Sequence, residues 1–257
     1  MAVAAYGCTG SSFLPQTYFG IYSHRITRGH RDHCDSREHA AASPGTRKGK
    51  GEPHLLREQQ QQIGLAMAMY SDDSNDQMPW PNWGNSYGPG WLYQPVSGRA
   101  PDLMKTNEMK YIEAGVYWKY LNTRAVYNCP LDKTNHISWQ KRAQRVSSYI
   151  MNGAVCGFEE RPDHRTFKLS AFNPVAYVIW EPDIKNFGGS YGPNPGFDAS
   201  QFPNHDEGVG RRHKKGAVII GFSGQVHFIK FEDFQREQTQ NKPGLLWCVP
   251  GAPRGGG

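Results

Sequence analysis

The chain has 257 residues, a hydrophobic fraction of 37% and a formal charge of +6. Seven Trp, thirteen Tyr and twelve Phe supply a real core for one large domain or two small ones, which excludes a chain disordered throughout. Much of the basic excess lies within residues 25–50, so the charge does not indicate a nucleic-acid partner. As written, the sequence shows neither a membrane-length apolar run nor a signal peptide.

The N-terminal segment has scattered charge and no hydrophobic periodicity, so we expect residues 1–52 to lack a stable core. The same segment can encode an apolar sequence in a different reading frame. In that frame, each codon consists of the last two bases of one present codon and the first base of the next. In that frame, residues 21–37 permit FTLIELLVVIAIIAIL and residues 38–45 permit SMLLPAL. Read so, the segment becomes a membrane-length apolar helix with an export signal.

The first predicted element of the globular part is a helix over residues 54–70, where apolar residues recur at helical spacing. The short polar side chains of 71–76 should end it. A Pro/Gly/aromatic loop follows, and residues 108–122 predict a second, short helix. Residues 125–133 read as an extended segment that ends at Cys129–Pro130.

Strands are predicted over 145–153 and 175–180, the second of them central because it is apolar throughout. After a long loop over 184–212, two strands flank a two-residue turn at Ser223–Gly224. A last helix is expected over 233–240, and a flexible tail over 243–257. These elements predict an α+β domain over 53–242, with a helix packed on a small antiparallel sheet and long loops.

Four short motifs stand in a fixed order along this domain. Residues 62–79 read QIGLAMAMYSDDSNDQMP, and a CPxD box and an SYxxN strand follow. A histidine is then followed after nine residues by Ser-Gly. The motif residues are Cys129, Pro130, Asp132, Tyr149, Asn152, His213, Ser223 and Gly224.

Together, the motifs resemble prepilin-type proteins related to the major pseudopilin of type II secretion, in the subfamily with a C-terminal H-x9-DG element. The resemblance covers residues 61–238, with Ser223 in place of the Asp, and the shifted-frame FTLIE string resembles the prepilin-peptidase signature. It implies a non-catalytic subunit of a type II secretion or type IV pilus-like fibre. The partners would be other pilin-like subunits and secretion-machine proteins, and prepilin peptidase only if the anchor is in frame. The head would face the periplasm or surface from the inner membrane.

Two other functions remain open on the sequence. A soluble carbohydrate- or protein-binding module would expose an aromatic loop, whereas we expect most of its residues to be buried. These residues are Trp80, Trp83, Tyr87, Trp91 and Tyr93. A metal-dependent hydrolase would draw on acidic and histidine residues, although their spacing matches no known metalloenzyme motif. These residues are Glu181, Asp183, His205, Asp206, Glu207 and His213.

Candidate ligands each have a plainer structural interpretation. Asp72, Ser74 and Asp76 have the alternating oxygen pattern of a calcium loop, but the following Gly is absent, which favours a solvated helix end. No other cofactor is expected. His213 is interpreted as a structural histidine in preference to a ligand or base. The cysteines contain no CxxC, so Cys129 is either a buried thiol or the partner of a Cys that the shifted frame permits at 56–57.

Overall fold

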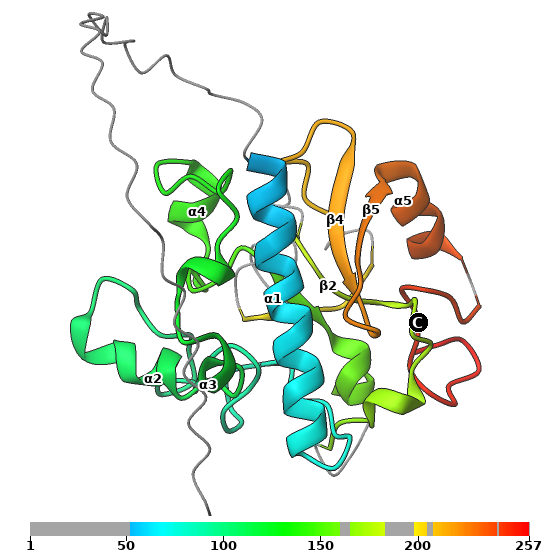
Figure 1. Ribbon diagram of the computed structural model, residues 1–257, viewed down its shortest axis with the longest axis horizontal. Helices are drawn as coiled ribbons and strands as arrows, with labels where there is room; N and C mark the ends of the chain where they lie inside the picture. The colour runs from blue at the N-terminus through cyan, green and yellow to red at the C-terminus, as the bar shows by residue number, and fades with distance from the viewer. Residues whose placement is uncertain (1–51, 160–164, 183–197, 205–207, 241, 257) are drawn as a thin grey trace, which may run out of the picture. The chain divides into compact units, whose positions relative to one another are not determined.

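The computed structural model describes residues 52–159, 165–182, 198–204, 208–240 and 242–256, all within one compact unit, Arg47–Gly257 (Figure 1). The segment with the alternative reading frame lies outside these residues. The elements in chain order are α1 (Glu52–Asp73), η1 (Thr106–Glu108), α2 (Met109–Glu113), α3 (Trp118–Leu121), η2 (Ala125–Tyr127), α4 (Ile137–Lys141), β1 (Ile150–Asn152), η3 (Gly153–Glu159), η4 (Leu169–Ala171), β2 (Tyr177–Trp180), β3 (Ser200–Gln201), β4 (Gly216–Gly221), β5 (Val226–Lys230) and α5 (Phe231–Thr239).

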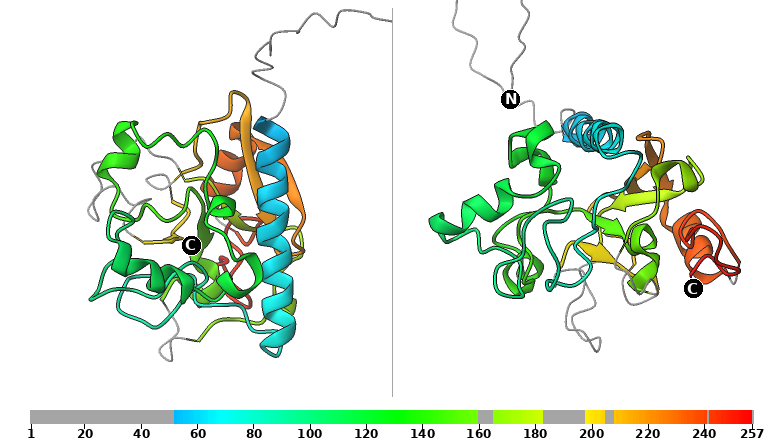
Figure 2. Two further views of the ribbon diagram at one scale, coloured as in Figure 1. Left: turned by 60° about the vertical axis from the view of Figure 1, so that its left-hand side comes forward. Right: turned by 90° about the horizontal axis from the view of Figure 1, so that it is seen from below.

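Helix α1 lies against β4 and β5 along one face of the sheet (Figures 1 and 2). Its 22 residues correspond to about 33 Å of helix. Leu56, Ile63 and Met67 are buried on one side, because spacings of seven and four residues return to the same helix face. The predicted helix is therefore confirmed. It ends where the backbone N–H of Asp76 donates to the Ser71 carbonyl at 2.8 Å.

The sheet has five strands in the order β3-β1-β2-β4-β5. Strand β2 is central, as the sequence predicts, and its pairs with β1 and β4 are antiparallel, as is the β4–β5 pair. Strand β3 runs parallel to β1. The prediction of a wholly antiparallel sheet is therefore wrong at this edge. Because β1 and β2 are antiparallel, a strand parallel to β1 runs opposite to β2.

The two faces of the sheet pack against different layers. In β4, Val218 and Ile220 belong with the core on the α1 side, while Ala217 and Ile219 pack in a second cluster with Phe234 of α5. This alternation follows from the two-residue side-chain period of a strand. Helix α5 confirms the predicted last helix, and its contact with β5 places it on the side away from α2 and α3 (Figure 1).

The hairpin between β4 and β5 is confirmed, but its turn is longer than predicted. Four residues, 222–225, connect the strands, and Gly221 exchanges backbone bonds with Gly224 and Gln225. Gly224 has φ 77°, as the sequence requires of a turn glycine. Phe222 joins the core instead of the strand, where it stacks on Phe172 with ring centroids 3.9 Å apart.

Two local predictions are corrected before β1. The helix expected over 108–122 is divided into α2 and α3 around Gly115, where a Cβ would lie 2.3 Å from the Leu92 carbonyl oxygen. The close approach of the 92–93 backbone displaces a continuous helix. The segment expected to be extended begins with the 3-10 turn η2, which contacts α1.

The C-terminal segment packs into the domain instead of forming a flexible tail. Leu246 is 0% exposed and Trp247 is 6% exposed. The Trp247 ring meets Phe158 and Phe202 edge-to-face, with centroids 5.7 Å and 5.1 Å away. The expectation for 243–257 is therefore corrected, because aromatic burial outweighs the local Gly/Pro content. None of the helices in the described part of the chain is long and apolar enough to cross a membrane.

Candidate functional site

Three segments that are far apart in the sequence bring Cys129, Glu181 and His213 together. Cys129 follows η2, Glu181 directly follows β2, and His213 precedes β4. The loop before His213 is held against the end of β2, because the Gly210 N–H donates to the Glu181 carbonyl at 2.7 Å. A Cβ at Gly210 would lie 2.7 Å from the carbonyl oxygen of Pro182, so this approach requires glycine.

The three side chains form a compact, mostly buried group. The Nε2 atom of His213 lies 3.1 Å from a Glu181 carboxylate oxygen and 3.8 Å from the Cys129 sulfur. Glu181 is 0% exposed and Cys129 is 2% exposed, whereas the His213 side chain is 16% exposed. Solvent therefore reaches the group from the histidine side.

A buried ionic network adjoins this group. The Asp132 carboxylate lies 2.7 Å from an Arg142 nitrogen and 3.4 Å from an Arg212 nitrogen, and Arg212 also lies 3.8 Å from Glu181. Burial alone would raise the pKa of Asp132, but the charges of Arg212 and Arg142 and the Ser148 hydroxyl together lower it. Asp132 is therefore ionised, and its charge compensates the two arginines.

The SYxxN strand is joined to the CPxD box through a serine. The Ser148 hydroxyl donates to Asp132 at 2.6 Å and accepts from the Cys129 N–H at 3.0 Å. Tyr149 is buried beside the cluster, and burial, with the nearby Glu181 and Cys129, raises its pKa well above the usual range. The CPxD box, the first part of the SYxxN strand and the motif histidine therefore meet at one place.

The chemistry of Cys129 in this setting is that of a neutral thiol. Burial raises its pKa well above the usual range, and the Glu181 charge acts in the same direction. The backbone N–H of Leu131 points at the sulfur from 3.4 Å and acts in the opposite direction. A thiol held protonated is a poor nucleophile, so the group does not resemble an activated Cys–His pair.

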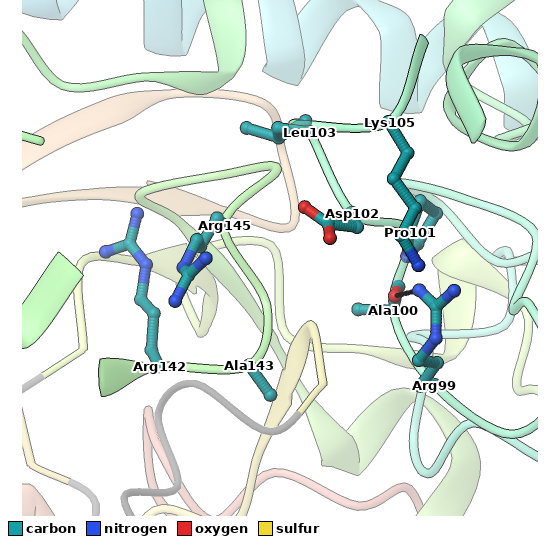
Figure 3. Close-up of a pocket in the computed structure, with 9 residues that line it drawn as sticks. All are labelled: Arg99, Ala100, Pro101, Asp102, Leu103, Lys105, Arg142, Ala143 and Arg145. Carbon is teal, nitrogen blue, oxygen red and sulfur yellow. Dashed lines mark hydrogen bonds between the residues drawn. The ribbon is translucent and has the colours of Figure 1, made fainter. Parts of the chain in front are cut away.

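A cavity of about 190 Å³ lies next to the network and is lined by cationic side chains (Figure 3). Its lining residues are Arg99, Ala100, Pro101, Asp102, Leu103, Lys105, Arg142, Ala143 and Arg145. The Arg99 and Lys105 charges are paired with Glu108 at 2.5 Å and 3.4 Å, and Arg142 is paired with Asp132. Glu108 and Asp132 therefore reduce the positive charge that faces the cavity, but each of these carboxylates is shared between two cations.

A second hollow, of about 760 Å³, lies beside the C-terminal end of α1. Tyr70 and Trp80 line it together with Gln77, Arg165 and Lys168. We predict burial for most of the five aromatic loop residues, and two of them, Trp91 and Tyr93, are 0% exposed. Trp80, Trp83 and Tyr87 are partly exposed.

The calcium candidates lie where α1 ends and the following turn begins. Asp72 is exposed, and the Asp76 carboxylate accepts hydrogen bonds from the backbone and hydroxyl of Ser170. The calcium prediction therefore stays a prediction. Of the proposed hydrolase residues, Glu181 and His213 meet, whereas Asp183 and 205–207 lie outside the described residues.

The remaining motif residues have other positions. Asn152 is buried in β1, and its amide donates at 2.9 Å to the carbonyls of both Tyr177 and Leu246. Ser223 and Gly224 lie in the hairpin turn, away from Cys129. Cys129, Cys156 and Cys248 are free thiols, which agrees with the buried-thiol interpretation of Cys129.

Sequence reasoning missed Arg142, Arg212 and Ser148. Arg212 directly precedes the motif histidine, and Ser148 is itself the first residue of the SYxxN motif, so the motifs could have indicated both. Arg142 has no such signal, because it reaches Asp132 from a separate segment after α4. Comparison with known protein families, with characterised proteins and with solved structures finds no match to this chain.

Proposed function

We propose that this protein is a structural, pilin-like subunit of a type II secretion or type IV pilus-like assembly. The observation that carries the proposal is the position of α1, which lies along the sheet and directly follows the segment with the alternative reading frame. A head built around the C-terminal part of one long helix suits a subunit whose N-terminal part packs into a fibre. The FTLIE string and the ordered motifs support the same function.

The outer face of α1 offers contact surface to neighbouring subunits. Leu55, Leu65 and Met69 are 45%, 62% and 44% exposed, although each has a large apolar side chain. Apolar residues exposed along one helix are common at protein interfaces. In the assembly they would extend the packing of the anchor helices over the first part of the head.

The proposal is tested by resequencing the codons for residues 15–65 and by identifying the mature N-terminus with mass spectrometry. We expect the reported gene sequence to lack one base near codons 57–62. The mature chain should begin with FTLIE and insert into the inner membrane. Cysteines placed at positions 65 and 69 should then crosslink neighbouring copies of the subunit. Recovery of a peptide containing HRITRGHRDH from the native protein would refute the anchored subunit.

The hollow beside α1 favours a second candidate, a carbohydrate-binding module, because Tyr70 and Trp80 lie there among polar side chains. Calorimetry with a panel of oligosaccharides tests it, and Trp80→Ala should abolish any heat of binding that is found. The hydrolase alternative has weaker support. Cys129 and Glu181 are almost completely buried, and neither cavity described above is lined by them.

A further inference from the structure

We propose that Cys129, Glu181 and His213 form a zinc-binding site in the head. The ligands would be the cysteine sulfur, a glutamate oxygen and the Nε2 atom of the histidine. This site goes beyond the structural function proposed above and does not depend on it.

The positions of the donor atoms suit a single ion. All three lie within 4.8 Å of one another. Bonds of about 2.0–2.3 Å in a tetrahedral zinc site place neighbouring donors about 3.3–3.6 Å apart. The observed separations are 3.1 Å from His213 to Glu181 and 3.8 Å from His213 to Cys129, so small side-chain shifts suffice.

Glu181 supplies an independent reason for a cation. Its side chain is completely buried, and neither carboxylate oxygen accepts a hydrogen bond of good geometry from the described residues. A buried carboxylate without hydrogen bonds is costly. Its nearby positive groups are Arg212, which is shared with Asp132, and His213 if protonated. A bound ion would satisfy the carboxylate directly.

A bound ion would have to displace the thiol proton that burial retains, and one backbone donor would then stabilise the thiolate. The Leu131 N–H points at the Cys129 sulfur from 3.4 Å, which favours negative charge on it. Arg212 bridges Asp132 and Glu181 and would orient the glutamate from outside the coordination sphere. Two carboxylates already compensate Arg142 and Arg212, so the ion and the thiolate together add one positive charge. A hydroxide or other anion at the fourth position would balance it.

The donor types select zinc over calcium or magnesium. Thiolate and imidazole are ligands of zinc and other late transition metals, while calcium and magnesium take oxygen donors. Three protein donors leave the fourth tetrahedral position to solvent, on the side where His213 is partly exposed.

The first experiment uses the full chain, stripped with a chelator, incubated with Zn²⁺ and desalted. We expect about one zinc per chain by mass spectrometry of the metal. X-ray absorption at the zinc edge should show one sulfur at about 2.3 Å and nitrogen or oxygen neighbours at about 2.0 Å. A shell of nitrogen and oxygen alone, or no retained zinc, would overturn the proposal without any variant.

Matched variants assign the ligands. Cys129→Ser and His213→Gln should each lower zinc occupancy by more than about tenfold at equal protein concentration. Cys156→Ser removes another buried thiol, and His227→Gln removes a histidine of β5, so both should keep wild-type occupancy. Circular dichroism identifies variants that fail to fold. If a ligand variant does not fold, the X-ray absorption spectrum of the wild-type protein decides whether the cysteine sulfur binds the zinc. Unchanged occupancy in folded Cys129→Ser would refute the site.

Discussion

Gly64 in the middle of α1 and Gly224 in the β4–β5 turn meet backbone to backbone. A Cβ built on Gly64 would lie 2.5 Å from the Gly224 carbonyl oxygen, and one on Gly224 would lie 3.3 Å from the Gly64 carbonyl oxygen. The long helix therefore approaches the hairpin as closely as two backbones allow. Glycine inside the helix, which normally lowers helix stability, is explained by this contact.

Gly64→Ala should destabilise the protein even though alanine is the better helix former by about 1 kcal/mol. The new methyl group must push α1 off the hairpin turn, and overpacking of this kind costs about 1–3 kcal/mol. The measurement is the free energy of unfolding from urea titration. Gly88→Ala is the control, because no atom lies within 4 Å of its Cβ position. A Gly64→Ala protein as stable as Gly88→Ala would show that the contact is not tight.

Asp132→Asn should destabilise the protein strongly, by about 3–5 kcal/mol, because it removes the carboxylate paired with buried Arg142 and leaves buried Arg212 only the more distant Glu181, at 3.8 Å. The Asp132, Arg142 and Arg212 side chains are 2%, 4% and 5% exposed. Asp73→Asn is the matched control, because its ion pair with Lys119 has an aspartate that is 56% exposed. The control should change the unfolding free energy far less, because an exposed ion pair contributes little to stability. Equal effects in chemical denaturation would contradict the buried network.

The pH dependence of stability should carry opposite contributions from two buried aspartates. Burial raises the pKa of Asp198 to about 6, despite hydrogen bonds from the Ser200 and Gly84 N–H groups. Between about pH 4 and 6 the unfolded chain loses this proton while the folded chain keeps it. Stability therefore falls as pH rises through that window, by on the order of 3 kcal/mol. The lowered pKa of Asp132 acts oppositely, and its contribution disappears as pH falls through the folded-state value.

Carbon-13 NMR of the aspartate carboxyls checks this directly, with assignments from Asp198→Asn and Asp132→Asn. Asp198 should titrate near pH 6 and Asp132 below the ordinary aspartate range. A midpoint for Asp198 at or below about 4 would contradict the expected effect of burial.

Asn152→Ala should cost about 3 kcal/mol or more, because it removes three buried hydrogen bonds at once. Its amide donates to the Tyr177 and Leu246 carbonyls, and its oxygen accepts from the Ala154 N–H at 3.0 Å. Asn128→Ala provides the comparison, because that half-buried side chain donates one such bond, to the Arg124 carbonyl. The difference in melting temperature measures the effect, and similar melting temperatures would show that Asn152 does not hold these segments together.

Elements with strong local signals could be predicted from the sequence. Apolar periodicity is sufficient for α1, and a continuous apolar run is sufficient for the central strand β2, because both signals are contained within one segment. The parallel pairing of β3 could not be predicted in the same way. Strand β3 has only two residues and pairs with a strand far away in the sequence, and no local pattern specifies such a pairing.

In the candidate site, too, single residues could be predicted from local sequence, whereas their arrangement in space could not. Glu181 and His213 belong to the metal-dependent hydrolase hypothesis and Cys129 to the CPxD box, and the spacing of the three matches no metal motif. The structure joins them through a loop that Gly210 holds against β2. Sequence spacing can reveal metal ligands that lie on one local element. These three ligands lie on three separate segments, so their spacing gives no such signal.

The hydrogen bond from Asn152 to Leu246 spans 94 residues and closes only when the last part of the chain is present. The Asn152 amide can meet the Tyr177 carbonyl once β2 has been made, but its second carbonyl partner, Leu246, becomes available only near the end of synthesis. The growing chain therefore remains without its final packing for almost all of its synthesis. Folding of the domain is therefore completed only after its last segment is made, because that segment contributes Leu246 and Trp247 to the buried core.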